Sequence, residues 1–483
     1  MFHRRLPSAE QWVSKGVPPM SATGISSLRA LLPVETAARE LDAKLLLAAF
    51  LAREGGEAIV GSHARINNTL HRLPANCYVS QTIVRSKRRI FRIIRALGMH
   101  LAAWDEEGLV WPSVAYYRRR RLDPVNFHSL ERFFAWGEEQ AEIVREAFPG
   151  EAHKLIVTGN PRQDLYLPAM RPLYAAKVKT IRREFGEFIL VNSNFGSVNH
   201  ARLPYTGLEK SDADIRALAD YSKHEPEYIA FRYRVFRGFC ELIPQLAHAF
   251  PHKNIIIRPH PSENVAAWQE VARPFANVHV RYEYDLVPWL LAAEAIVHNG
   301  CTTAVEAAML ERPVIEFRPV TDEAWENPQP REVSIPAPTV KDVIGLLRRP
   351  EAMERERSQV ERALRHVIAH WNEGFASERI ARELMRLARE PVSGSSSMAS
   401  FIARLKSRLR GMEKWVVGRT MPWKSASPAY IDKKFPPMPV KDVRMRLHRL
   451  AELAGVPKPE IEELDDRIWH VTPAGPGKGE TGA

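Results

Sequence analysis

The stretch AIVHNGCTTAVEAAMLERPVIEF, residues 295–317, decides the fold. An apolar run ends at His298, Gly300 permits a tight turn, and an Ala-rich helical pattern starts at Thr302. Arg312 and Pro313 then lead into a second apolar run, PVIEF. A strand, a crossover helix and a second strand are the repeating unit of a parallel α/β sheet.

The same alternation runs from about residue 35 to residue 390 and pauses at about 165–186. It predicts two facing Rossmann-like α/β domains, 1–165 and 180–390, and the second is closed by helices at about 351–390. Segment 391–400 has the composition of a linker, and 401–483 is predicted to be a basic helical appendage with a disordered end. The other expected strands are 57–61, 77–81, 100–104, 132–136, 154–159, 187–192, 254–259 and 277–282.

The composition is that of a globular protein with a sizeable core. The chain has 483 residues, of which 45% are hydrophobic and 26% charged, which excludes a disordered chain and a disulfide scaffold. The cysteines, Cys77, Cys240 and Cys301, are far apart, and this fits a reducing compartment. No apolar run is long enough to span a membrane, and the start does not resemble a secretory signal. We therefore expect a cytoplasmic protein that can sit peripherally on the inner membrane.

The net charge of +12 is unevenly distributed. Residues 391–450 contain 13 Lys/Arg and 3 Asp/Glu, so most of the excess lies after the linker. Within them, 401–418 combines apolar residues at helical spacing with five basic residues and Trp415. Two interpretations stay open: a helix that packs on its own protein, or one that lies on an anionic membrane surface. A nucleic-acid partner is not expected.

Three consecutive carboxylates, Asp105, Glu106 and Glu107, follow the expected strand 100–104 and precede Gly108. Repulsion among them is expected to raise the pKa of at least one, which suits a general base. The alternative is an acidic surface turn.

The sequence IIIRPHPSE (255–263) brings Arg258, His260 and Ser262 into one stiff loop at a strand end. We expect Ser262 to cap the following helix and the loop to bind an anion. The alternative is a proline-rich turn around a structural histidine.

Two more polar loops follow strands. Gly300, Thr302 and Thr303 are expected to hold phosphate at a helix N-terminus, with Glu306 one turn on and within reach of a ribose diol; the alternative is a well-capped core helix. The other loop, LVNSNFGSVNH (190–200), contributes Asn194, Gly196 and Ser197, unless it is an ordinary loop.

Other signatures are absent or weak. No GxxxxGK[ST] or GxGxxG motif follows an expected strand, and no HExxH or GxSxG motif is present; this disfavours P-loop NTPases and dinucleotide oxidoreductases. Asp212-Ala213-Asp214 spells the DxD of metal-dependent sugar transferases, but it lies in a helix-like stretch with no preceding strand. We expect neither a metal nor a cofactor.

Residues 30–390 resemble the bacterial surface-carbohydrate biosynthesis proteins of the GT-B glycosyltransferase class. The resemblance rests on residues 31–55, VTGNPRQDLY (157–166), NSNFGSVNH (192–200), IRPHPSE (257–263) and residues 298–315. Glu106-Glu107-Gly108 is similar to the [DE][DE]G motif of sialyl-, polysialyl- and Kdo-transferases, and His260-Pro261 to their HP motif. Thr302-Thr303 matches their hydroxyl motif loosely.

The resemblance implies transfer of a sugar from a nucleotide-sugar donor, CMP-activated donors included, to a surface polysaccharide or a lipid-linked glycan. Glu107 would be the general base, and His260 would act on the donor phosphate. Glu106, Arg118 and Arg119 would lie on the acceptor side, in the first domain. The second domain would hold the donor with Arg258, Ser262, Asn194, Gly196, Ser197, Gly300, Thr302, Thr303 and Glu306.

Other functions on the same scaffold stay open. They are a sugar-nucleotide epimerase, a glycerol-phosphate transferase, and a non-catalytic polysaccharide assembly protein.

Overall fold

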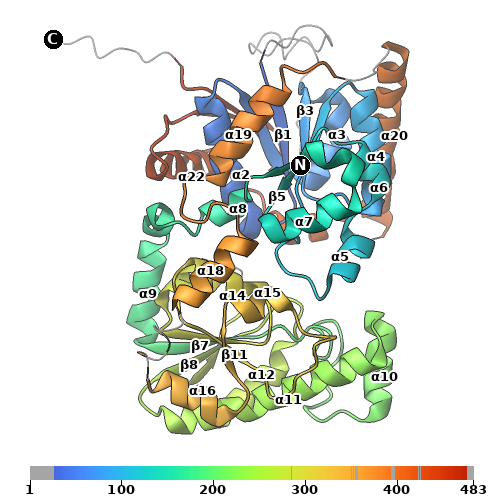
Figure 1. The fold of residues 1–483 in the computed structure, drawn as a ribbon. Coiled ribbons are helices and arrows are strands. Elements are labelled where there is room, and N and C mark those ends of the chain that lie inside the picture. Colours follow the sequence, from blue (N-terminus) through green and yellow to red (C-terminus); the bar gives the residue numbers. More distant parts are fainter. Residues whose placement is uncertain are drawn as a thin grey trace, which may run out of the picture. The chain divides into compact units, whose positions relative to one another are not determined.

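The computed structural model describes residues 27–283, 285–349, 351, 353, 357–392, 397–421, 424 and 426–475. These residues form two compact units (Figure 1). Unit 1 contains the described residues of Met1–Gly108, Arg118–Leu165 and Ile368–Ala483, and unit 2 contains those of Leu109–Tyr117 and Tyr166–Val367. Part of the expected linker (393–396) and the end of the expected tail (476–483) lie outside the described residues.

Unit 1 is built on an eight-stranded sheet in the order β13-β14-β2-β1-β3-β4-β5-β6. The strands from β2 to β6 run parallel, because helices connect them. Every residue of the central strand β1 is buried, as expected for a strand covered on both faces. The strands are β1 (Arg29–Val34), β2 (Glu57–Ser62), β3 (Cys77–Ser80), β4 (His100–Ala103), β5 (Arg132–Ala135), β6 (Leu155–Val157), β13 (Glu460–Asp465) and β14 (Ile468–Thr472).

Helices cover both faces of this sheet. Helices α2, α19 and α22 pack together on one side, and α3, α4 and α20 pack together on the other (Figure 1). The α-helices are α2 (Ala37–Arg53), α3 (His63–Thr69), α4 (Arg88–Ala96), α5 (Val114–Arg121, which includes the boundary between the units), α6 (Pro124–His128), α7 (Glu138–Ala147), α8 (Pro161–Asp164), α19 (Ala376–Leu387), α20 (Ser397–Thr420), α21 (Pro428–Lys434) and α22 (Val440–Leu453). Short 3₁₀ helices are η1 (Leu70–Arg72), η2 (Arg85–Lys87) and η3 (Pro149–Lys154).

The described residues of segment 401–475 differ from the expected helical appendage, because they complete unit 1. Strand β14 pairs antiparallel with β2, and β13 pairs with β14. Ile468, Trp469 and Val471 are fully buried, and the Trp469 ring stacks on Phe435 with centroids 5.9 Å apart. The helix α19, which the sequence assigns to the second domain, also belongs to unit 1.

Unit 2 is built on a six-stranded parallel sheet in the order β12-β11-β10-β7-β8-β9. The long helix α11 packs with α12 and α16 on one face of it (Figure 1). Its strands are β7 (Phe188–Asn192), β8 (Asn254–Arg258), β9 (Val278–Val280), β10 (Ala295–His298), β11 (Val314–Phe317) and β12 (Ile335–Ala337). Its helices are η4 (Pro168–Leu173), α9 (Ala175–Phe185), α10 (Asp212–Ser222), α11 (Pro226–Ala249), α12 (Val265–Ala272), α13 (Val287–Ala292), α14 (Thr302–Met309), α15 (Pro328–Glu332), α16 (Val340–Leu347) and α18 (Arg357–Val367).

The core of unit 2 follows from the alternation of apolar side chains along its strands. Ile255 and Ile257 of β8 and Val297 of β10 are fully buried with the aromatic side chains of α11. Each such side chain contributes about 1.5–3 kcal/mol when it leaves water. The predicted fold class, Rossmann-like α/β with parallel sheets and helices on both faces, is therefore confirmed for each unit.

Both sheets have a topological switch point, where ligands of open α/β sheets bind. In unit 2 the chain leaves β7 toward β8 on one side and later returns to β10 on the other. The loops after β7, β8 and β10 are therefore neighbours at the carboxyl edge of the sheet. They are three of the four loops that the sequence singles out.

Candidate functional site

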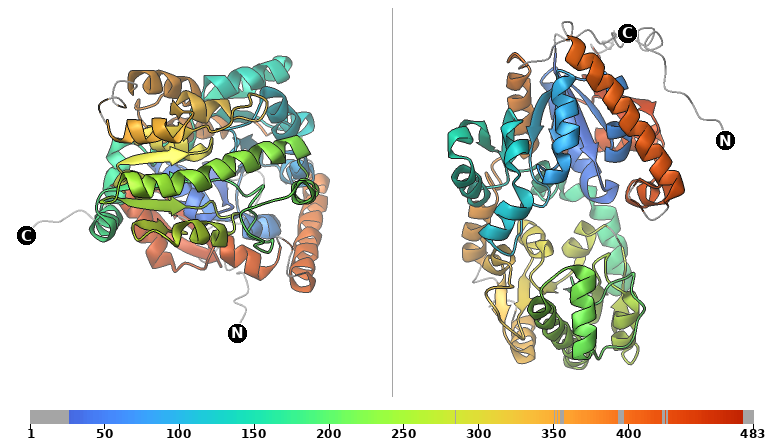
Figure 2. Two further views of the ribbon diagram at one scale, coloured as in Figure 1. Left: turned by 90° about the horizontal axis from the view of Figure 1, so that it is seen from below. Right: turned by 90° about the vertical axis from the view of Figure 1, so that its right-hand side faces the viewer.

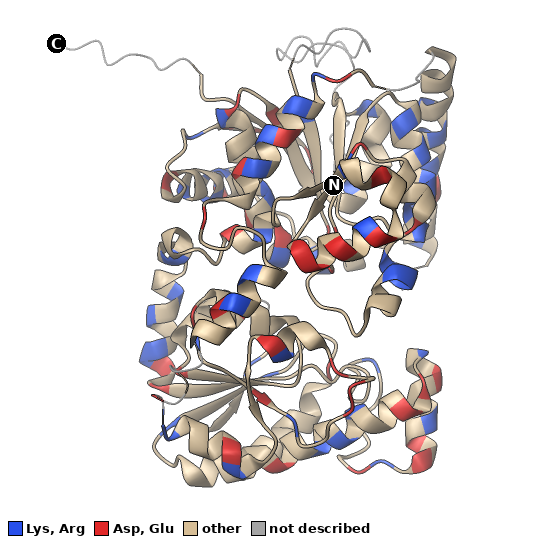
Figure 3. Cartoon of the chain, in the orientation of Figure 1, with Lys and Arg blue, Asp and Glu red and all other residues tan. Residues whose placement is uncertain are grey.

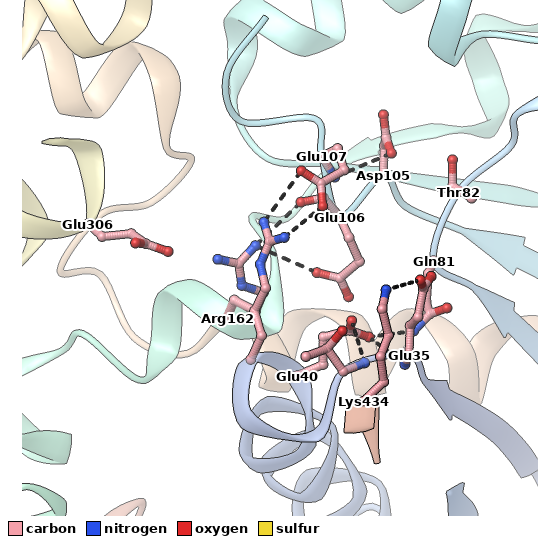
Figure 4. Close-up of polar contacts among 12 residues, drawn as sticks. Glu35, Glu40, Gln81, Thr82, Asp105, Glu106, Glu107, Arg162, Glu306 and Lys434 are labelled. Atoms are coloured by element: carbon pink, nitrogen blue, oxygen red, sulfur yellow. Dashed lines mark hydrogen bonds and ion pairs between the residues drawn. The ribbon is translucent and has the colours of Figure 1, made fainter. Parts of the chain in front are cut away.

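The fourth loop follows β4 in unit 1 and contains the three predicted carboxylates (Figure 4). Glu106 is buried, forms an ion pair with the buried Lys44, and accepts a hydrogen bond from the Trp104 indole at 2.8 Å. Arg162 of α8 donates to the Glu106 carbonyl oxygen at 3.3 Å. Because its carboxylate is engaged by Lys44, Glu106 serves the architecture of this loop rather than an exposed acceptor surface.

Asp105 is also buried and pairs with Arg121 of α5. Burial raises its pKa, and Arg121 counteracts the shift. The sequence attributes a raised pKa to repulsion among the carboxylates, whereas the first cause is burial and the residue is not the predicted base.

Glu107 is the one member of the triplet with a half-exposed side chain, at 51%. Its carboxylate pairs with Arg39 of α2 at 2.7 Å. Partial burial opposes ionisation, but Arg39, Arg162 and Arg121 outweigh it and hold the pKa of Glu107 below its usual value. Glu107 is therefore ionised at neutral pH.

A buried carboxylate that the sequence did not reveal lies beside this loop. Glu40 of α2 accepts hydrogen bonds from the backbone N–H groups of Glu35 (3.1 Å) and Thr36 (3.2 Å) and from the Gln81 amide (Figure 4). Burial, and then repulsion from Glu106, raise the pKa of Glu40 to about 7. Its signal in the sequence is the pair Glu40 and Lys44, which are four residues apart within the apolar run of the helix at 35–55.

The predicted acceptor-side arginines have different surroundings. Arg118 forms an ion pair with Glu146, and Arg119 is exposed. Arg121, two residues further on, is the member of the run that contacts the acidic loop, through Asp105.

In unit 2 the loop after β8 is held by one buried carboxylate, Glu263. It accepts hydrogen bonds from the His260 backbone N–H (2.8 Å), the Ser193 hydroxyl (2.8 Å) and the Trp268 indole (2.9 Å). Burial raises the pKa of Glu263, and these donors counteract it. The loop is thereby tied to the loop after β7, while the His260 side chain stays exposed.

Ser262 does not cap helix α12, contrary to the expectation. The cap is Asn264, whose side chain accepts from the Ala266 N–H at 3.1 Å. The Ser262 hydroxyl instead contacts His260 Nδ1 at 2.7 Å. It lies against Gly196, where an added Cβ would meet the Ser262 hydroxyl and come within 3.0 Å of its Cβ.

Asn194 and Ser197, on the loop after β7, are partly exposed, and the Asn194 carbonyl accepts from the Asn299 amide at 3.1 Å. Arg232 of α11 donates to the carbonyls of both Asn194 and Asn299, and so links the loops after β7 and β10. Sequence analysis missed Arg232. The only signal in the sequence is an arginine within the largely apolar segment that forms α11.

The loop after β10 turns at Gly300, whose φ of +80° lies in the region that favours glycine. Helix α14 then begins with Thr302, which is partly exposed, and Thr303, which is buried. The Asn192 amide donates to the Thr303 hydroxyl at 3.0 Å. Thr303 therefore connects β7 to α14, and of the two hydroxyls Thr302 is the more accessible.

Glu306 lies one turn into α14, is buried, and accepts a hydrogen bond from the Tyr166 hydroxyl at 2.9 Å. Arg258 ends β8 and donates to the Asn192 amide oxygen at 3.3 Å. Burial lowers the pKa of the Arg258 guanidinium, and the carboxylate of Glu306 counteracts this. Tyr166 is a further residue that sequence reasoning missed.

Three loops thus meet at the switch point of unit 2 and combine a cation, an exposed imidazole and the N-terminus of α14. Such an arrangement suits the phosphates of a nucleotide. Asp214, by contrast, forms a capping box with Ser211 at the start of α10, so half of the DxD sequence has a structural role.

No protein-family model and no curated protein matches this sequence. Among solved structures, the chain is similar to the UDP-GlcNAc 2-epimerase from Neisseria meningitidis bound to UDP-GlcNAc, with 13% identity, coverage of 74% of this chain and 100% of that one, and a TM-score of 0.49. It is also similar to the wall teichoic acid polymerase TagF, with 10% identity, coverage of 76% and 90%, and a TM-score of 0.48. Similarities this distant assign no activity to the chain.

Proposed function

We propose that this protein is a glycosyltransferase of the GT-B type. It would move a sugar from a nucleotide-sugar donor to a cell-surface polysaccharide or a lipid-linked glycan, without a metal ion. It would act on the cytoplasmic side of the bacterial inner membrane. The observation that carries the proposal is the convergence of the loops after β7, β8 and β10 in unit 2.

The donor is assigned to this loop surface. Arg258, His260 and the N-terminus of α14 with Thr302 would stabilise the negative charge that develops on the departing phosphate. Glu306, held by Tyr166, would bind the ribose hydroxyls.

The base is assigned to Glu107. The acceptor hydroxyl oxygen would bond to the anomeric carbon while the bond from that carbon to the phosphate oxygen breaks. The hydroxyl proton would pass to Glu107, which is ionised at neutral pH as a base must be. Arg39, at 2.7 Å, holds the carboxylate in place.

Nucleotide binding is tested first, by the thermal stabilisation that CMP, CDP and UDP each give. His260→Ala is expected to weaken the binding of the preferred nucleotide about tenfold, because it removes one charge-assisted contact. His252→Ala is the matched control, because His252 is also exposed and precedes β8, whereas His260 follows it. Equal effects of the two substitutions would remove His260 from the site, and no response to any nucleotide would favour a non-catalytic protein.

Catalysis is tested with Glu107→Gln, which should abolish transfer and leave nucleotide binding unchanged. Glu138→Gln is the control, because Glu138 is similarly exposed and also pairs with an arginine, Arg145, at 2.5 Å. Full transfer activity in Glu107→Gln would refute the assigned base.

Product analysis separates the other reactions. Conversion of the donor sugar without any acceptor would identify an epimerase, and release of CMP from a CDP-activated polyol would identify a glycerol-phosphate transferase.

A further inference from the structure

Helix α20 packs against the rest of unit 1 with its small and basic face, which in an ordinary amphipathic helix would face the solvent. Ala403, Ser407 and Gly418 are its buried residues. Arg410 donates to the Asn67 carbonyl at 2.9 Å, and Gly411 lies so close that an added Cβ would be 2.5 Å from the Asn68 carbonyl oxygen. Small and basic side chains therefore form the contact with α3, and α20 runs along the outside of unit 1 (Figure 2).

The opposite face of α20 is apolar and exposed. Its large side chains recur every three or four residues over about 27 Å of helix, at 1.5 Å per residue. They are between 42% and 66% exposed: Met398, Phe401, Ile402, Leu405, Leu409, Met412, Trp415 and Val416. We call this set the apolar stripe. Soluble proteins seldom leave so many neighbouring apolar side chains in water, so a stripe of this kind indicates a binding surface.

The surroundings of the apolar stripe are strongly basic (Figure 3). Helix α20 contains six Lys/Arg and one acidic residue, Glu413, which is paired with Arg89 of α4 at 2.8 Å. Arg419 stacks over the Trp415 ring at 4.0 Å. Aromatic and aliphatic side chains bordered by a net positive charge match the interface of an anionic bilayer. No helix among the described residues is long and apolar enough to cross a membrane.

A cavity of about 400 Å³ lies in unit 1 beside the packed face of α20. Its walls come from α3, the η2–α4 segment, α20 and α21. Five basic residues line it: Lys87, Arg89, Arg410, Lys414 and Lys434. One acidic residue, Glu35, is among the lining residues, and it is paired with Lys434 at 2.6 Å.

The cations of this cavity are crowded. Lys87 Nζ is 2.7 Å from His63 Nε2, and burial lowers the pKa of Lys87 to about 8. Burial, and then the charges of Lys87, Arg410 and Lys434, lower the pKa of His63, so the neutral ring accepts a hydrogen bond from Lys87 and the cations of the cavity are its lysines and arginines. Positive groups that repel one another in a partly closed space are stabilised by a bound anion, and a phosphate fits both the charge and the volume.

We propose that unit 1 binds an anionic membrane lipid, with the apolar stripe of α20 in the bilayer interface and the lipid phosphate in the cavity lined by Lys87, Arg410 and Lys414. The two features share helix α20: the stripe occupies its exposed face, and Arg410 and Lys414 line the cavity from its packed face. The alternative ligands fit less well. Nucleic acid would leave the apolar stripe exposed to water, and a neutral membrane would not balance the positive charge of the cavity.

Co-sedimentation of the full chain with vesicles tests the proposal. The vesicles are phosphatidylcholine alone, or phosphatidylcholine mixed with phosphatidylglycerol, and binding is expected with the mixture. Leu409→Asp should weaken vesicle binding tenfold or more, because a side chain that would be buried in the bilayer interface becomes charged. Val125→Asp is the matched control, since Val125 of α6 is 49% exposed on the same unit, outside α20.

The cavity is tested with Lys414→Ala, expected to weaken binding to the mixed vesicles about fivefold. Inorganic phosphate at matched ionic strength should compete with this part of the binding in the wild type and not in Lys414→Ala. Thermal unfolding of each variant without vesicles confirms that it is folded.

Several outcomes would overturn the proposal. They are equal binding to both kinds of vesicle, loss of binding in Val125→Asp as in Leu409→Asp, and phosphate binding in the cavity without any vesicle binding. A Leu409→Asp variant that converts a dimer into a monomer, with no vesicle binding by the wild type, would make the stripe a contact between two copies of this chain.

Discussion

The substitution Gly61→Ala should loosen the C-terminal hairpin β13–β14 from unit 1. Gly61 of β2 pairs with Ile468 of β14. A Cβ on Gly61 would meet the Arg467 carbonyl oxygen and lie 2.9 Å from the Ile468 Cα. Both are backbone atoms, so no side-chain rotation can relieve the overlap.

The cost lies between two limits. If β14 shifts and stays paired, the overpacking costs about 1–3 kcal/mol. If the hairpin leaves the sheet, Ile468, Trp469 and Val471 lose their full burial, at about 1.5–3 kcal/mol each. We therefore expect Gly61→Ala to lower the free energy of unfolding by at least about 1 kcal/mol.

Urea denaturation measures this change, and limited proteolysis shows whether residues 460–475 become the first site of cleavage. Gly150→Ala is the matched control in unit 1, because nothing lies within 4 Å of a Cβ at Gly150. It should change stability by less than about 0.5 kcal/mol. Wild-type stability and wild-type cleavage in Gly61→Ala would refute the tight pairing of β14 with β2.

Three further changes test other parts of the fold. Burial raises the pKa of Glu316 from 4.5 to about 7, so folding stability should fall as the pH rises through that window, by about 3 kcal/mol in total. Glu316→Gln should flatten this part of a pH series of urea denaturations, and an unchanged slope would contradict the assignment. Lys44→Met should lower the free energy of unfolding by about 3–5 kcal/mol, because it leaves the buried Glu106 carboxylate without its ion pair. Adding Glu106→Gln should restore part of this loss. Equal stabilities of the single and double variants would contradict the role assigned to the ion pair. Asn264→Ala should cost about 1 kcal/mol by thermal unfolding, and more than Ser262→Ala, because Asn264 caps α12.

The strands that the sequence predicted are present in both units; most are buried along their length, whereas the edge strands β6 and β9 are only partly buried. The run EAIVG became β2, and NIIIRP became β8. Strand β1 was missed because it contains Pro33, which usually argues against a central strand. Strands β13 and β14 were missed. The sequence of β13, EIEELD, is mostly acidic and has little apolar character, and both strands follow a basic segment that is predicted to be helical.

The candidate site was predicted as a set of loops rather than as a set of contacts. The loops after β4, β7, β8 and β10 could be found because polar residues follow apolar runs. Which groups are engaged could not be found, because hydrogen bonds such as that from Asn192 to Thr303 join residues far apart in sequence. Which face of α20 packs against the protein could not be predicted either, since an amphipathic pattern does not show whether the apolar or the basic face is buried.

Unit 2 is nearly continuous in the chain, as residues 166–367, whereas unit 1 is assembled from both ends of it. During synthesis all of unit 2 is made before α19, α22 and β14. Unit 2 can therefore complete its sheet while the chain is still growing, and unit 1 must wait until β14 has been made. Until then β2 has an open edge, so β14, which covers that edge, also closes off a route to aggregation.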